Sequence, residues 1–166
     1  MAQRELVVYA LENAASVVLL YIAHKLRREL RVFYGELCPT IGWLVRRFDF
    51  EEIREIPRET PIAVPLSLEE SSELLLSLAL ELELLALVRG RALFPLASVP
   101  QEHLELYSAY RKLPVCPRKD FGGLVRSIFE ELEETTPMAR YQFLSSVERL
   151  REIAERRVRK SRTTKG

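Results

Sequence analysis

The last quarter of the chain is one long, arginine-rich segment with a continuous apolar stripe. From Pro137 to Lys160 the apolar residues recur every three or four positions, which places them on one face of an α-helix: Phe143, Val147, Leu150, Ala154 and Val158. Such a face has to be covered by other helices, either of the same chain or of a partner. The sequence therefore predicts a mainly α-helical protein with a small β-containing region, whose helical C-terminal domain is built for subunit packing.

Composition is that of a folded chain with an uneven distribution of charge. Apolar residues make up 48% and charged residues 30% of the 166 positions, which excludes a disordered protein. The formal net charge is only +1. Five glutamates and no basic residue fall within Glu69–Glu83, whereas Arg149–Gly166 holds eight Lys or Arg against two glutamates. This separation indicates polar partner surfaces or mutual attraction between subunits.

The N-terminal part is harder to interpret from periodicity. Residues 4–31 fit one helix, although the β-branched residues within Val17–Ile22 leave a strand open as an alternative. Short apolar runs separated by Pro and Gly predict an irregular β-containing region over residues 32–64. After it, Ser67 is expected to cap a helix, and residues 80–88 fit either a helix or a strand.

Clear helices are predicted over residues 101–112, 120–132 and 137–160, after a short strand near residue 92. We therefore expect an N-terminal domain over residues 1–96, a helical domain over 97–160 and a flexible basic tail over 161–166. The apolar Leu6–Ala23 stretch is interrupted by polar residues, so neither a membrane helix nor a signal peptide is expected and the chain is assigned to the cytoplasm. Cys38 and Cys116 are expected to be free thiols rather than a disulfide.

No catalytic constellation is visible in the sequence. His24 and His103 are far apart and lack neighbours that would make a metal or catalytic signature. Adjacent glutamates such as Glu69 and Glu70 project about 100° apart on a helix, so they do not form a carboxylate dyad and are expected on solvated faces. We expect no catalytic residues, no cofactor and no metal, and thus a protein that is not an enzyme.

The basic C-terminal end allows two interpretations. Its cations could contact phosphates of a nucleic acid, or they could follow the dipole of a helix C-terminus and remain solvated. The candidate nucleic-acid contacts are Arg156, Arg157, Arg159, Lys160 and Arg162.

Three local patterns resemble the GINS family of replication-helicase accessory proteins, in the branch that places a small β-rich domain before the helical one. They are Thr60–Leu68, the strand and helix from Arg91 through Lys112, and Leu113–Phe121. The Arg-rich segment Leu150–Lys160 is similar to the final helix of that family. Ser67 and Gly122 depart from the aromatic residues usual at those positions, and the first 35 residues are more helical than a plain β domain.

The resemblance implies a non-catalytic scaffold subunit that pairs with a sister subunit in a hetero-oligomer, as a tetramer. This assembly would bridge an MCM-type replicative helicase and a RecJ-like protein, with direct DNA contact left open. The interface would be formed by apolar residues of the last two helices: Leu124, Ile128, Leu132, Phe143, Val147, Leu150, Ala154 and Val158. The thermophile-like scarcity of amides, with Asn only at Asn13, agrees with an archaeal source.

Two other functions remain open at this point. One is a small nucleic-acid-binding protein that uses its basic C-terminal helix or its N-terminal region, and the other is an inactive structural subunit of an RNA-processing enzyme.

Overall fold

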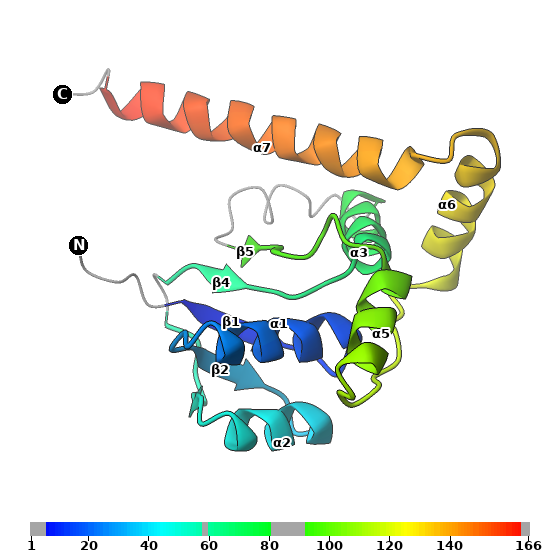
Figure 1. Cartoon of the computed structure of the whole chain (residues 1–166). Coiled ribbons are helices and arrows are strands. Elements are labelled where there is room, and N and C mark those ends of the chain that lie inside the picture. The colour runs from blue at the N-terminus through cyan, green and yellow to red at the C-terminus, as the bar shows by residue number, and fades with distance from the viewer. Residues whose placement is uncertain (1–5, 58–59, 81–91, 164–166) are drawn as a thin grey trace. The chain divides into compact units, whose positions relative to one another are not determined.

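The computed structural model describes residues 6–57, 60–80 and 92–163, with the side chains of the last helix described up to residue 154 and at Arg156 (Figure 1). The described residues form six helices and a small five-stranded parallel sheet. The predicted fold class, mainly α with a small β-containing region, is therefore confirmed.

The helices and strands alternate over the first half of the chain. The strands are β1 (Val7–Ala10), β2 (Arg31–Tyr34), β3 (Glu51–Glu52), β4 (Ile62–Ala63) and β5 (Ala92–Leu93). The helices are α1 (Ala14–Lys25), α2 (Pro39–Arg47), α3 (Leu68–Leu80), α5 (Gln101–Tyr110), α6 (Gly123–Thr135) and α7 (Ala139–Thr163).

The sheet has the strand order β3-β2-β1-β4-β5, and every pairing is parallel. Val8 of the central strand pairs with Val32 of β2 on one side and with Ala63 of β4 on the other. Parallel neighbours need crossover connections, and α1 and α2 provide them between β1, β2 and β3. This strand order is that of a doubly wound α/β sheet, in which the chain reverses its direction of travel between β1 and β4.

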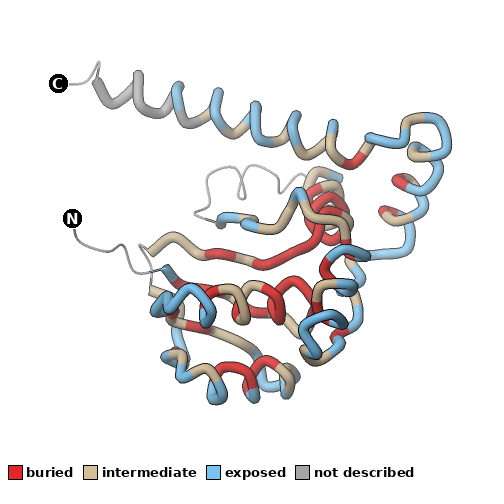
Figure 2. The backbone as a smooth tube through the Cα atoms, viewed as in Figure 1, coloured by how far each residue is buried: buried red, intermediate tan, exposed pale blue. Residues whose placement is uncertain are grey.

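One face of the sheet is covered by α1 and α2. Val8, Val32 and Ala63 form a buried cluster with Leu20 of α1 and Leu44 of α2. On its other side α1 packs against α5, where Ala14, Ala15 and Val18 meet Leu104. Helix α1 is thus buried on two sides, and Figure 2 shows its tube mostly red and tan.

This double burial explains why the single helix predicted over residues 4–31 is wrong. The residues form β1, α1 and β2 in succession, and the strand considered within Val17–Ile22 is part of α1. Because α1 is apolar on both packed faces, its sequence lacks the polar face that separates a helix from a buried strand.

The helices α1, α2 and α5 all end without a glycine. Each of them ends in a Schellman motif, in which the residue after the C-cap is left-handed. The left-handed residues are Arg27, Asp49 and Lys112, with φ of 51°, 56° and 55°. Because glycine is the usual signal for such an end, the ends of α1 and α2 were hidden from sequence inspection, whereas Pro114 indicated the end of α5. The region over residues 32–64 was accordingly expected to be irregular, whereas it contains the helix α2.

The other predicted elements agree with the structure within a few residues. Helices α5, α6 and α7 correspond to the segments predicted over 101–112, 120–132 and 137–160, and β5 corresponds to the expected strand near residue 92. The choice between helix and strand for residues 80–88 falls almost wholly outside the described residues.

The chain divides into two compact units by its internal contacts. Unit 1 comprises Met1–Glu70 and Arg91–Asp120, and unit 2 comprises Ser71–Gly90 and Phe121–Gly166. Residues 91–120 thus belong with the N-terminal sheet, so the boundary expected after residue 96 does not coincide with this division. The described part of unit 2 consists of the later turns of α3 together with α6 and α7. Phe129 and Phe143 join α6 to α7 edge to face, with ring centroids 5.5 Å apart.

Candidate functional site

The fold itself indicates where a ligand site would be expected. In doubly wound sheets, ligands bind outside the carboxyl ends of the strands at the point where the strand order reverses. Here that point is the end of β1 and the end of β4, which are followed by Glu12–Asn13 and by Pro65–Ser67. The polar residues at this edge of unit 1 are therefore the candidates for a site.

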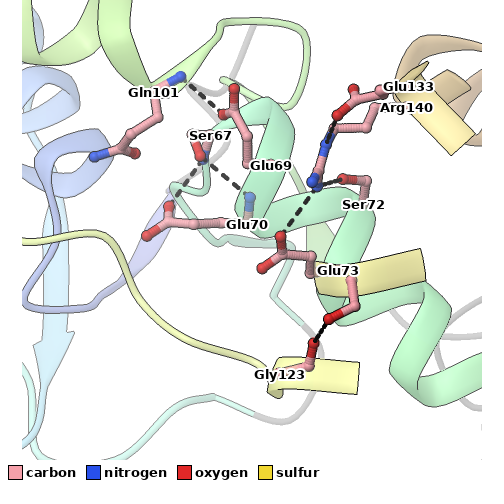
Figure 3. A network of polar contacts seen from close by, with 10 residues as sticks. Ser67, Glu69, Glu70, Ser72, Glu73, Gln101, Gly123, Glu133 and Arg140 are labelled. Carbon is pink, nitrogen blue, oxygen red and sulfur yellow. Dashed lines mark hydrogen bonds and ion pairs between the residues drawn. The ribbon is translucent and has the colours of Figure 1, made fainter. Parts of the chain in front are cut away.

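Glu70 is the buried polar centre of this edge. Its side chain is completely buried, and one carboxylate oxygen accepts hydrogen bonds from the Asn13 side-chain amide at 2.9 Å and from the Ser67 backbone N–H at 3.0 Å. The other oxygen accepts from the Lys119 backbone N–H at 2.7 Å. Ser67 in turn accepts from the Glu70 N–H at 3.2 Å, which completes a capping box at the start of α3 (Figure 3).

Burial raises the pKa of the Glu70 carboxyl, and this effect outweighs the hydrogen bonds from Ser67, Lys119 and Asn13, which lower it. The three donors would favour an ionised carboxylate, whereas the loss of water disfavours it. Glu70 is therefore a buried acid held between several segments of unit 1.

Each of the other helix starts in unit 1 is also capped by a side chain of the protein itself. Asn13 accepts a hydrogen bond from the Ser16 N–H at 2.9 Å and so caps α1. Glu12 accepts from the N–H groups of Thr40 and Ile41 at the start of α2, at 3.1 and 3.4 Å. The start of α5 is capped in the same manner, where the Gln101 N–H donates to Glu69 at 2.8 Å (Figure 3).

These caps affect whether the helix starts at this edge can bind an anionic ligand. The exposed N–H groups of a helix start are the groups that bind phosphate in many α/β proteins. In unit 1 the carboxylates of Glu12, Glu69 and Glu70 already accept hydrogen bonds from these groups. The helix starts at this edge are thus already bound by carboxyl groups of the chain itself.

The segment after α5 completes this edge. Cys116 is buried, and its thiol lies 3.8 Å from a carboxylate oxygen of Glu12. Burial raises the pKa of the Cys116 thiol, which keeps it protonated and able to donate to that oxygen. Both cysteines are free thiols, as expected from the sequence, with Cys38 half-buried.

A second buried polar cluster lies within unit 2. The guanidinium of Arg140 is buried and donates to Glu73 at 3.1 Å, to Ser72 at 3.0 Å and to Glu133 at 3.2 Å (Figure 3). It also lies over the ring of Phe129, 4.5 Å from the centroid. This cluster joins α3, α6 and α7, and the fork of the guanidinium matches its several acceptors.

The expectation that the adjacent glutamates lie on solvated faces was wrong for the start of α3. Glu70 and Glu73 are fully buried, and Glu69 is half-buried against the start of α5. Ser67 at position N-cap with Glu70 three residues later is a recognisable capping box, so this part could have been found from the sequence. Asn13 carried a weaker signal, as the one amide inside an apolar stretch, and Arg140 carried none.

Of the residues predicted for a subunit interface, some are exposed and others are half-buried. Leu124, Leu132 and Leu150 are exposed by 72%, 47% and 53%. The remaining described members are half-buried: Ile128, Phe143, Val147 and Ala154. The side chain of Val158 lies outside the described residues. The inward face of α6 is instead formed by Val125 and Phe129, which the sequence analysis did not assign to the core.

Arg156 is exposed and lies 3.9 Å from Glu152 one turn earlier in α7. The other candidate nucleic-acid contacts have side chains outside the described part of the chain: Arg157, Arg159, Lys160 and Arg162.

The described part of the chain contains neither a cluster of metal-ligand side chains nor a helix that could span a membrane. Its His, Cys, Asp and Glu side chains form no group of three or more that could hold a metal ion. His24 stacks on Phe48, and exposed His103 lies 3.7 Å from Glu102. None of the described helices combines the length and the apolar character needed to cross a membrane.

No protein-family model and no curated protein sequence matches the chain.

The role of Glu70 can be tested by Glu70→Gln. The amide cannot accept from the Asn13, Ser67 and Lys119 donors together, so we expect a loss of about 1–3 kcal/mol in the free energy of unfolding near pH 5. The pKa of Glu70 is higher in the folded than in the unfolded protein, so the protonated side chain favours folding. This stabilisation is complete at a pH below the unfolded-state pKa and is lost as the pH rises through the folded-state pKa. The difference in the free energy of unfolding between wild type and variant, measured with urea, should therefore become smaller as the pH rises.

The matched control is Glu131→Gln on the exposed face of α6, for which no pH-dependent gap is expected. A Glu70→Gln gap that is constant between pH 5 and 8, or that widens, would contradict the assignment.

The Arg140 cluster predicts a non-additive pair of substitutions. Arg140→Ala leaves the buried Glu73 without its guanidinium and should lower the free energy of unfolding by about 3–5 kcal/mol. Replacing both partners, as Arg140→Met with Glu73→Leu, removes the buried charges together and should recover most of that loss. Urea unfolding of Arg140→Met, of Glu73→Leu and of the double variant measures the coupling energy between the two residues. Losses of stability that simply add in the double variant would exclude such a coupling.

Proposed function

We propose that this chain is a non-catalytic subunit of a larger protein assembly, which it joins through the helices α6 and α7. The observation that carries the proposal is the set of large apolar residues that α6, α7 and the turn between them leave exposed. The exposed fractions lie between 47% and 72%, and the residues are Leu124, Leu132, Met138, Leu150 and Ile153. Large exposed apolar surfaces on a folded protein mark interaction sites.

Charge supports a second helical subunit as the occupant of this face. Four glutamates lie in α6, at positions 130, 131, 133 and 134, whereas the sequence from Arg149 onward is strongly basic. A partner helix with opposite charges at the two ends could pair with both elements. Charge patterns of this kind select the partner and its orientation more than they add affinity.

The carboxyl edge of the sheet in unit 1 also supports a structural role. Its helix starts are capped by Asn13, Glu12, Glu69 and the Ser67–Glu70 capping box, and Glu70 serves as an acceptor for three segments. Such an arrangement favours a stable scaffold at the position where related architectures hold substrates.

The sequence resemblance supplies a finer form of the proposal. In it the chain is an archaeal, cytoplasmic GINS-like subunit for DNA replication, which pairs with a sister subunit in a tetramer. It would connect an MCM-type helicase with a RecJ-like protein. This finer form rests on the Thr60–Leu68, Arg91–Lys112, Leu113–Phe121 and Leu150–Lys160 patterns alone.

The test is the double substitution Leu150→Glu with Ile153→Glu. Both side chains are about half exposed, so the isolated chain should fold normally, whereas burying two carboxylates in an apolar contact should weaken assembly at least about tenfold. The measurement is affinity capture of the tagged chain from its native cells, with the stoichiometry and mass of the complex determined. A helical subunit of similar size and an MCM-type helicase should be retained by the wild type.

Leu37→Glu provides the matched control, because Leu37 is a 91% exposed leucine in unit 1. This variant should retain the same partners as the wild type. A complex of unchanged mass in the double variant would exclude α7 as the assembly face. A stable complex without a helicase subunit would exclude the finer GINS-like form alone.

A further inference from the structure

A line of aromatic rings crosses the outer surface of unit 1 over three helices. Phe48 at the end of α2 lies 6.3 Å from Tyr21 of α1, and Tyr21 lies 6.3 Å from Tyr107 of α5, measured between ring centroids. His24 of α1 stacks on Phe48 at 4.4 Å with an interplanar angle of 15°. We use the name aromatic strip for these rings together with Tyr110 of α5, which shares the Arg111 guanidinium with Tyr107, and Trp43 of α2, the helix whose C-cap is Phe48.

Two rings of the aromatic strip are exposed to solvent. Trp43 is 45% exposed and Tyr110 is 76% exposed, whereas Tyr21, Phe48 and Tyr107 are half-buried. The half-buried rings therefore pack between the helices, and Trp43 and Tyr110 are the rings that solvent reaches most. Helix α1 lies between the other two, as Figure 1 shows.

Cations lie directly on these rings. The ammonium of Lys25 is 5.5 Å from the Tyr21 centroid, and the guanidinium of Arg47 is 5.0 Å from that of Trp43. Arg111 lies between Tyr107 and Tyr110, at 5.6 and 5.1 Å. Each contact is within the range of a cation–π interaction, and the three cations are exposed.

The surrounding sequence adds further positive charge. The segments 21–29, 43–50 and 107–112 hold seven Lys or Arg against Glu29 and Asp49, in a chain whose net charge is only +1. Arg27 and Lys112 occupy left-handed positions at the ends of α1 and α5, where glycine is the usual residue. Attraction of a cation to the helix C-terminus offsets part of the strain of that conformation.

We propose that the aromatic strip is a binding surface for single-stranded nucleic acid. Unpaired bases stack on exposed aromatic faces without regard to sequence, and arginines and lysines beside the rings neutralise the phosphates. The carboxylates of an acidic protein surface could pair with the cations but would not stack on Trp43 and Tyr110, whereas a nucleic acid supplies a flat base with every phosphate. This inference concerns unit 1 and does not depend on assembly through α6 and α7.

Trp43 provides a direct measurement, because it is the chain's single tryptophan. Stacking of a base on the indole should quench its fluorescence. The full chain is titrated with oligothymidylate and with oligouridylate of about 20 nucleotides, which exceeds the ~4–16 nucleotides that one small domain typically covers. Quenching by both indicates a surface that accepts either backbone, and quenching by one of them identifies DNA or RNA as the ligand.

Variants locate the binding surface. Tyr110→Ala and Arg111→Ala should each weaken binding about 5- to 100-fold, the range seen when one stacking side chain is removed. Raising the salt from about 50 to about 200 mM should weaken binding as well, because phosphate contacts release counterions. Leu37→Ala, a change at a remote exposed leucine, and Arg156→Ala on α7 should leave the affinity unchanged. Circular dichroism verifies that each variant is folded.

Three outcomes would overturn the proposal. The first is no quenching and no change in the anisotropy of a labelled oligonucleotide up to ~100 µM protein, the weak limit of non-specific binding. The second is equal binding of polyglutamate, which would indicate simple charge attraction. The third is binding that Arg156→Ala weakens and Tyr110→Ala does not, which would place the ligand on α7.

Discussion

The hydrogen bonds of Glu70 connect the parts of unit 1 on which its fold depends. Through this one buried carboxylate, the start of α1 meets the start of α3 and the segment that follows α5. These segments are separated by about 50 residues of sequence in each direction, so local preferences cannot bring them together. Asn13 strengthens the connection, because the same side-chain amide also donates to the Pro65 carbonyl at 3.0 Å. A buried polar network of this kind specifies one arrangement, since any alternative would leave buried donors and acceptors without partners.

The sequence predicted the helices of unit 2 well and those of unit 1 poorly, for a physical reason. The existence of α6 and α7 followed from apolar residues that recur every three or four positions, but the packed face of α6 did not. Val125 and Phe129 face inward there, whereas Leu124 and Leu132 of the predicted stripe are exposed. Helix α1 is packed on two sides, and Val17 and Val18 face different neighbours, so its period is hidden. The capping box of Ser67 and Glu70 was visible as a spacing. The bonds from Asn13 and Lys119 to that box were not, because they depend on the topology of the sheet.

The charge pattern had a similar limit. The acidic stretch from Glu69 onward was interpreted as a polar partner surface, but its first three glutamates serve internal contacts. Glu69 caps α5, Glu70 completes the capping box and Glu73 binds Arg140. Negative charge near the start of a helix is also favourable for its dipole, which makes α3 a suitable element to carry two of these carboxylates in its first turn. Net charge in a sequence window therefore says little about surface potential until burial is known.

Charges inside the folded chain and charges on the surface of unit 1 are paired in different ways. Inside the folded chain, Glu12, Glu70 and Arg140 are paired with specific donors or acceptors, and each pairing offsets the cost of removing a charge from water. On the outer surface of unit 1, Lys25, Arg47 and Arg111 instead rest on aromatic rings, with the cation itself left in solvent. A cation that lies on a ring at the surface stays accessible to solvent, where it can bind a phosphate. This difference in pairing separates the residues that hold the fold together from those placed to meet a ligand.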